Sequence, residues 1–216
     1  MLNLGIGGTF YGRYLDKMQS VLSILVNHSY ESVMRRRLKN HNFSIICSNC
    51  AGGVIYHRLG EKFLSPTVNL WLRQRDFLKL AANLREYLSY ELEFIDSEYD
   101  YPVARLKDIT IYFNHSKSAE EAATDWNRRK TRINYDNLFL LMYDRENLTM
   151  DELRQIEQIP CRRKVVFSNQ SRSALPYIVT MKPTNNPQGA QYMDKDWFGM
   201  RTFEKQFDYV KWLNGE

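Results

Sequence analysis

FSIICSNCAGG, at residues 43–53, is the stretch that decides the fold. Its apolar first half indicates a half-buried strand that we expect to end at Ser48. A tight, glycine-bearing loop should follow, because paired glycines accept positive φ and let a ligand approach main-chain N–H groups. In an α/β protein the carboxyl end of a strand is where ligands bind. The loop therefore supplies the first candidate site residues, Asn49, Cys50, Gly52 and Gly53.

Strand and helix patterns alternate along the chain. Apolar alternation and β-branched runs predict strands at 43–48, 63–71, 92–95, 109–113, 137–143, 164–167 and 178–181. Helical spacing and two capping boxes predict helices at 13–40, 76–90, 118–130, from Thr149 onward and at 203–213, with a long loop at 183–199. This alternation favours an α/β fold, a three-layer α/β/α sandwich with a mixed, mostly parallel sheet. We expect an amino-terminal leader and amphipathic helix at 1–40 and a single α/β domain at 41–216.

Composition places the chain among globular proteins. It has 216 residues, of which 44% are hydrophobic and 25% charged, and a formal net charge of +5. No apolar run approaches the ~20 residues that a bilayer span requires, and no secretory signal opens the chain. We therefore expect a cytoplasmic protein, with peripheral attachment to the inner face of the membrane left open. Basic clusters at 35–39, 128–132 and 162–164 suit nucleic acid, anionic lipid or phosphorylated small molecules. Without a zinc finger, an RNA-binding signature or a recognition helix, nucleic acid is not favoured.

Three cysteines are too few for a disulfide scaffold. Cys47 and Cys50 form one C-x-x-C, but no second ligand pair exists, and neither E-x-x-H nor H-x-H spacing occurs, so no metal site is expected. Cys47 shares strand parity with Phe43 and Ile45 and is expected to pack in the core. Cys50 remains a candidate catalytic residue by its position. Nucleophile-elbow, P-loop, dinucleotide and D-x-D signatures are all absent, so the sequence identifies no cofactor.

Two histidines follow predicted strands. His57 lies seven residues beyond Cys50, and His115 follows Asn114 at the end of the strand at 109–113. Strand ends meet at one sheet edge, so the two imidazoles are expected to face one another as general acid and base. For the glycine loop and His57 the competing interpretation is a tight strand-to-helix turn, in which the histidine only makes hydrogen bonds nearby; the glycines fit that turn equally well.

A third group of candidates lies on the helix at 118–130. Guanidinium groups lie close to an indole ring in this helix, a combination that suits a diphosphate or a sugar carboxylate. The residues are Trp126, Arg128 and Arg129, with Arg132 just beyond the helix. Salt bridges to Asp125 and Glu121 within the helix would explain the arginines equally well. For Glu121 itself we favour a structural role, as the capping-box partner of Ser118.

Several segments together resemble a bacterial family, the domain of unknown function 1919, whose members are often labelled exopolysaccharide biosynthesis protein. The segments are SNCAGGVIY (48–56), FLSPTVNL (63–70), YPV (101–103) and EAATDW (121–126) through RIN (132–134). The resemblance covers roughly residues 35–215 and implies a three-layer α/β/α sandwich with a mixed sheet. It also implies an association with capsule, lipopolysaccharide or exopolysaccharide genes, while the activity of the family is not established.

The resemblance extends the set of candidates. The matching positions are Asn49, Cys50, Gly52, Gly53, Ser65, Pro66, Asn69, His115, Glu121, Trp126, Arg129, Arg132 and Asn134. Ser65, Asn69 and Asn134 thereby join the ligand-binding candidates. Ala51 departs from the family, which often has Trp there, so an aromatic platform for a sugar ring is missing from this loop.

We expect an enzyme of cell-surface polysaccharide synthesis, a transferase acting on an activated sugar or glycan. In this hypothesis the glycine loop and the arginines bind a nucleotide sugar or phosphorylated glycan, and His57 or His115 is the base. The alternative is a non-catalytic accessory protein that binds an anionic membrane surface or a glycan-assembly partner. Its basis is the set of basic clusters and the aromatic carboxyl terminus, with Trp197, Tyr209 and Trp212.

Overall fold

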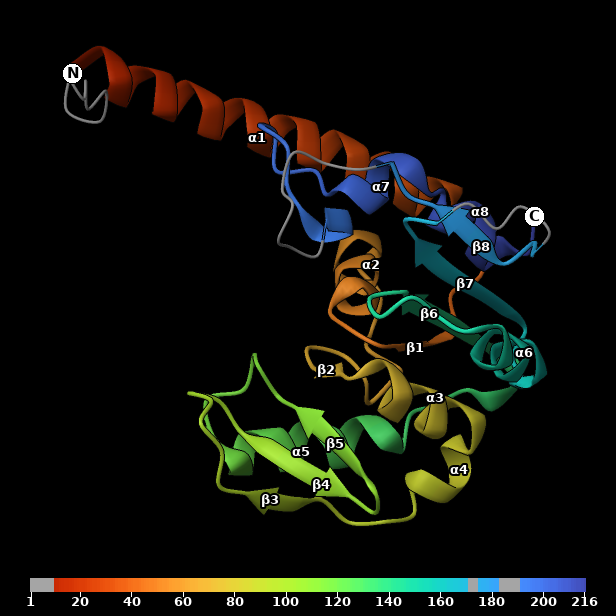
Figure 1. Cartoon of the computed structure of the whole chain (residues 1–216). Coiled ribbons are helices and arrows are strands. Elements are labelled where there is room, and N and C mark those ends of the chain that lie inside the picture. The colour runs from red at the N-terminus through yellow and green to blue at the C-terminus, as the bar shows by residue number, and fades with distance from the viewer. Residues whose placement is uncertain (1–9, 171–174, 183–190) are drawn as a thin grey trace, which may run out of the picture.

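A computed structural model of the chain describes residues 10–170, 175–182 and 191–216. Residues 1–9 of the predicted leader (1–12) and residues 183–190 of the predicted long loop lie outside these ranges, and residues 10–12 belong to the first helix. Figure 1 shows the chain as a central sheet with helices on both sides, a small second sheet at one end and a long helix across the other. Within the described ranges, no helix has both the length and the apolar character that crossing a bilayer requires.

The central sheet is parallel throughout. Its strands, in spatial order, are β1 (Ser44–Cys47), β6 (Leu138–Tyr143), β7 (Arg163–Ser168) and β8 (Ile178–Thr180). Every residue of β1 and β6 is buried, as expected for parallel strands covered on both faces. The apolar runs at 43–47 and 137–143 are thus explained by burial on two sides rather than one.

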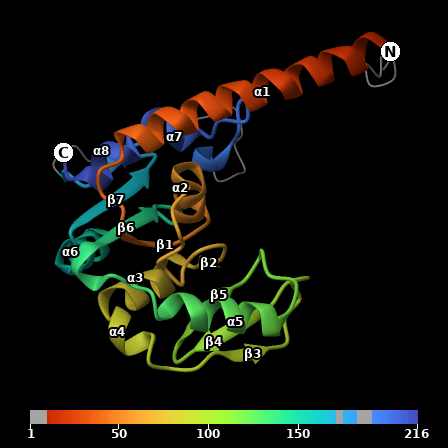
Figure 2. The same ribbon diagram turned by 180° about the vertical axis from the view of Figure 1, so that it is seen from behind.

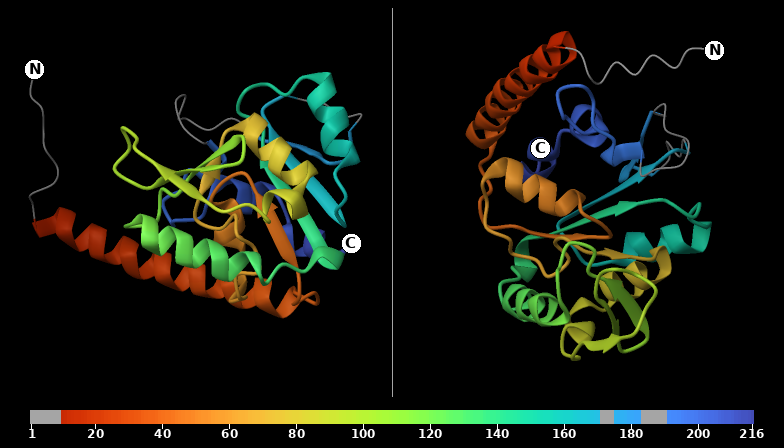
Figure 3. Two further views of the ribbon diagram at one scale, coloured as in Figure 1. Left: turned by 90° about the horizontal axis from the view of Figure 1, so that it is seen from below. Right: turned by 90° about the vertical axis from the view of Figure 1, so that its left-hand side faces the viewer.

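Each face of the central sheet packs against its own helices. Ile45 and Cys47 of β1 face a cluster that includes α2 (Ala51–Leu59), α7 (Thr202–Gln206) and α8 (Tyr209–Asn214). Ile46 faces the other cluster, which includes α3 (Gln74–Ala82) and α6 (Met150–Gln158). The two further views in Figure 3 show these layers. The α/β sandwich predicted from the sequence is confirmed.

The antiparallel strands form a separate sheet. They lie in the order β2 (Trp71–Leu72), β5 (Ile109–Tyr112), β4 (Val103–Leu106) and β3 (Glu93–Ile95). This sheet is inserted between α2 and β6. α3 and α4 (Leu84–Tyr87) lie between β2 and β3, and α5 (Ala119–Lys130) and the short helix η2 (Tyr135–Asn137) follow β5. A hydrogen bond from Leu72 N to Ser48 O (3.2 Å) ties β2 to the end of β1.

Three predicted elements differ from the structure. The segment 63–71 forms only the two-residue strand β2, because Pro66 and the left-handed backbone of Asn69 (φ 62°) interrupt it. The helix expected at 76–90 is broken at Asn83, and β4 was not predicted. The helix expected at 203–213 is split, because Asp208 caps the start of α8 by accepting from Lys211 N. A short helix, η3 (Gln191–Met193), precedes α7 in the chain.

The predicted amino-terminal helix is present as α1 (Phe10–Arg37). Its carboxyl half lies over α2, α7 and α8, and its amino-terminal end extends past the rest of the molecule (Figures 1 and 2). Arg58 of α2 binds both Glu31 of α1 (3.0 Å) and Glu204 of α7 (2.6 Å). This buried cluster fixes the three helices to one another.

Candidate functional site

The carboxyl edge of the central sheet has a topological switch point between β1 and β6. These strands are parallel neighbours, but α2, which follows β1, packs on one face and α6, which follows β6, packs on the other. The two connections therefore leave the edge in opposite directions, and open α/β sheets bind their ligands at such points. Cys50 lies on the first connection and Arg145 on the second.

A thiol and an imidazole meet at this point. The Cys50 Sγ atom lies 3.1 Å from His115 Nε2, although the residues are 65 positions apart in the sequence. His115 reaches Cys50 because it follows β5, whose sheet is tied to the end of β1 through β2. The pairing joins two candidates that the sequence placed on separate strand ends. The distance allows the imidazole to take the thiol proton.

The surroundings of Cys50 act on its charge in two directions. Burial raises the pKa of the Cys50 thiol above its ordinary value, while a hydrogen bond from Asn114 and the positive charges of Arg145 and Arg201 lower it. Burial prevails, so most of the thiol stays protonated at neutral pH in the absence of a base. The adjacent imidazole is placed to supply that base.

Cys47 differs sharply from Cys50. It is fully buried against α2, and burial raises the pKa of its thiol to about 12, despite hydrogen bonds from the backbone of Asn49, Gly52 and Ala51. The Asn49 Oδ1 atom also accepts from Ala51 N (2.9 Å). The amides that we expected to bind a ligand therefore serve the Cys47 sulfur and the first turn of α2. Both cysteines are free thiols.

Of the two interpretations of the segment after β1, the structure shows the tight strand-to-helix turn and not a ligand-binding glycine loop. Gly52 and Gly53 lie inside the first turn of α2, and neither has positive φ. A Cβ on Gly52 would approach Cys47 Cβ to 2.9 Å, and one on Gly53 would lie 3.0 Å from Asn69 Oδ1. Both glycines are needed because α2 packs closely on β1 and on the segment that carries Asn69.

Sequence reasoning missed the two arginines that act on Cys50. Arg145 donates to the hydroxyl of the buried Tyr192 (3.5 Å), and Arg201 lies 3.9 Å from Glu204. Arg145 follows the predicted strand at 137–143, so the strand-end rule used for His115 would have found it. Arg201 follows no strand and had no comparable signal.

His57 lies apart from the Cys50–His115 pair. It is exposed in the last turn of α2, about 10 Å along the helix axis from Cys50. The expectation that His57 and His115 face each other is wrong, because the residues after Cys50 form a helix that carries His57 away from the sheet edge.

The candidates on α5 are held in structural contacts. Arg129 is buried and binds Asp125 and Val68 O (3.0 Å), so it ties α5 to the segment before β2. Arg128 pairs with the same carboxylate. Trp126 packs edge-on against Phe113 in the core and has no exposed face to offer a ligand.

The remaining candidates lie on connecting segments. Ser65 is buried and bonds to Thr67, whose hydroxyl accepts from Cys47 N. Asn134 donates to Asn42 O (2.9 Å), just before β1 begins and therefore at the opposite edge of the sheet from Cys50. Arg132, half-buried, lies two residues beyond α5. Glu121 has the structural role expected at the start of α5, but the capping box is incomplete: its N–H donates to Ser118 Oγ, while its side chain accepts from Lys117 N instead of Ser118 N.

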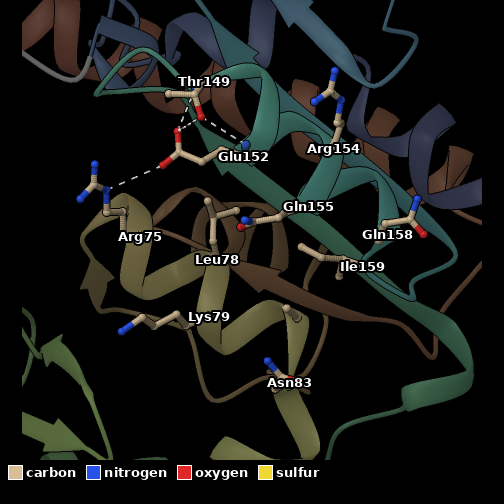
Figure 4. A pocket seen from close by; sticks show the side chains of 11 residues that line it. Arg75, Leu78, Lys79, Asn83, Thr149, Glu152, Arg154, Gln155, Gln158 and Ile159 are labelled. Carbon is tan, nitrogen blue, oxygen red and sulfur yellow. Dashed lines mark hydrogen bonds and ion pairs between the residues drawn. The ribbon is translucent and has the colours of Figure 1, made fainter.

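A cavity of about 890 Å³ opens between α3 and α6 (Figure 4). No predicted site residue lines it. Arg75 reaches Glu152 across its mouth (3.9 Å), and Glu152 also accepts from the Thr149 backbone and hydroxyl. Its acidic group is thus engaged in capping α6, and the cavity offers no counterpart to the thiol–imidazole pair.

Comparison with known proteins identifies the relatives of this chain. Residues 21–214 match the model of the domain of unknown function (DUF1919). A Haemophilus influenzae protein described as uncharacterized is 34% identical over 201 residues, which cover 92% of this chain and 97% of that protein. Neither description names a reaction or a polysaccharide. The chain belongs to the DUF1919 family.

Proposed function

We propose that this protein is a group-transfer enzyme of cell-surface polysaccharide synthesis that uses Cys50 as nucleophile and His115 as base. The observation that carries the proposal is the 3.1 Å approach of Sγ and Nε2 at the switch point of the sheet. A half-exposed cysteine with an adjacent imidazole is one of the arrangements that support covalent acyl transfer. The polysaccharide context comes from the family resemblance and is part of the proposal.

The transfer has two steps. His115 Nε2 takes the Cys50 proton, the thiolate attacks the carbonyl carbon of an activated acyl donor, and the bond from that carbon to the leaving group breaks as the leaving group takes the proton. A hydroxyl of the acceptor then attacks the thioester and gives its proton to His115. The C–S bond breaks, the proton returns to the sulfur, and the thiol is restored.

The charges around the pair favour an anionic acceptor. Arg145 is exposed and Arg201 half-buried, and both act electrostatically on Cys50, so a phosphate held between them would lie near the reacting sulfur. A nucleotide sugar or a phosphorylated glycan carries both this phosphate and free hydroxyls.

Intact-mass spectrometry tests the proposal. The full chain is incubated with thioester donors such as acetyl-coenzyme A, with and without a panel of nucleotide sugars. We expect one acyl adduct on the wild type, none on Cys50→Ser, and release of the adduct when the correct acceptor is added. Cys161→Ser removes another half-buried thiol and is the matched control, which should acylate normally.

His115→Asn separates catalysis from binding. It should slow adduct formation at neutral pH and recover part of the rate at high pH, where hydroxide deprotonates the thiol. Equal acylation of wild type and Cys50→Ser would refute the proposal.

A further inference from the structure

Between Leu15 and Asn27, α1 turns polar side chains towards the body of the protein and apolar side chains towards solvent. Gln19, Ser23 and Asn27 form a polar stripe that faces the body and donates to the carbonyl groups of Trp197 and Phe198 at 2.6–3.0 Å. The large apolar side chains of the same helix are exposed, with fractions between 38% and 67%. They are Leu15, Met18, Val21, Leu22, Ile24, Leu25, Val26 and Val33.

Four of these side chains form a narrow seam. Leu15, Met18, Leu22 and Leu25 recur at intervals of three, four and three residues, the spacing with which two helices interlock their side chains. At about 100° per residue, the centre of the seam lies about 120° around the helix from the polar stripe. Figures 1 and 2 show this part of α1 extending past the other elements, so a second helix has room to lie against it.

We propose that the seam pairs with α1 of a second copy of this chain. A side chain of this size carries on the order of 100 Å² of apolar surface. Without Ile24, the exposed parts of the seven remaining side chains offer about 600 Å² over the two copies, and flanking polar atoms bring the contact towards the ~1,000 Å² that a specific interface needs. The contact is small, so the dimer forms with a micromolar dissociation constant.

The charge of the helix favours a second copy over a lipid surface. From Met18 to Tyr30 the sequence has no Asp, Glu, Lys or Arg. Helices that lie on anionic membranes depend on cations along their polar face. Between Met18 and Tyr30 the polar face is neutral and already bonded to the body, whereas an uncharged apolar seam is complementary to an identical seam without any charge matching.

Sedimentation velocity of the full chain, from about 1 to about 100 µM, tests this proposal. The wild type should shift from monomer to dimer across the series. Leu22→Gln with Leu25→Gln should raise the dissociation constant on the order of 100-fold or more, since each copy loses two seam residues. Ile24→Gln is the matched control. Ile24 is the most exposed of these side chains but lies about 140° from the seam, so this variant should dimerise like the wild type.

Circular dichroism should show equal helix content in all three proteins. A wild type that stays monomeric at about 100 µM would overturn the proposal. So would a double variant that still dimerises, because another surface would then be responsible. Flotation of the monomer with neutral or anionic vesicles, lost in the double variant, would make a membrane the occupant and would also overturn it.

Discussion

Replacing Glu204 with Ala leaves the buried Arg58 guanidinium without its closest partner. The Glu204 side chain is fully buried, receives the Arg58 Nε–H at 2.6 Å, and also accepts from Arg201 N. Glu31 stays at 3.0 Å, so half of the pairing survives. Removing one member of a buried ion pair costs about 3–5 kcal/mol, and the remaining partner places this case near 3 kcal/mol. For a chain of this size that loss corresponds to a fall in Tm of about 6–12 °C.

Urea unfolding followed by circular dichroism measures this loss as a lower midpoint at an unchanged slope. Glu31→Ala should cost less, because Glu204 remains on Arg58. The double change Arg58→Met with Glu204→Met removes both charges and should recover most of the stability. A loss below about 1 kcal/mol for Glu204→Ala, or a double variant less stable than Glu204→Ala, would refute the view that an unpaired buried charge sets the cost.

Three further predictions concern single positions. Gly52→Ala should lower the free energy of unfolding, measured with urea, by about 1–2 kcal/mol, because the new Cβ meets the Cβ of Cys47, which cannot move away, and this cost exceeds the gain of about 1 kcal/mol in helix propensity. Gly53→Ala meets the movable end of the Asn69 side chain and should be close to neutral. Burial already raises the pKa of Cys50, and Asn114→Ala removes a donor that lowers it, so the pH midpoint of iodoacetamide labelling at Cys50 should move up, with Cys161 as the internal standard. Hydrogen bonds from Lys79 and Tyr87 lower the pKa of Asp108 from 3.8 to about 2, so its contribution to stability is present above pH 3.8 and is lost as the pH falls towards 2. Over this range Tm should fall less in Asp108→Asn than in the wild type. An equal fall of Tm with pH in both proteins would contradict this role of Asp108.

The parts of the fold that long apolar runs specify could be predicted. The strands at 43–48, 137–143 and 164–167 were found because burial on both faces leaves an unbroken hydrophobic signal. The inserted sheet was harder, since β4 is only four residues long and includes the exposed Arg105. Its existence depends on pairing with β5 and β3, which no local pattern encodes.

The candidate site was predicted in pieces. Cys50 and His115 were each identified from their place after a strand, but their contact depends on how the second sheet docks on β1, which is tertiary information. His57 was misplaced because Gly52 and Gly53 were read as loop formers, whereas a small side chain is also what a closely packed helix needs. Arg129 was assigned to a ligand because its acceptor, Val68 O, is a backbone atom that sequence cannot reveal.

The thiol and the imidazole come from two separately constructed sheets. Cys50 belongs to the parallel sheet, whereas His115 is delivered by the antiparallel insertion between α2 and β6. In the proposed mechanism, the nucleophile and its base therefore come from two separate parts of the chain. A longer or differently folded insertion in a relative would reposition the imidazole, while the cysteine and its supporting strands stayed as they are.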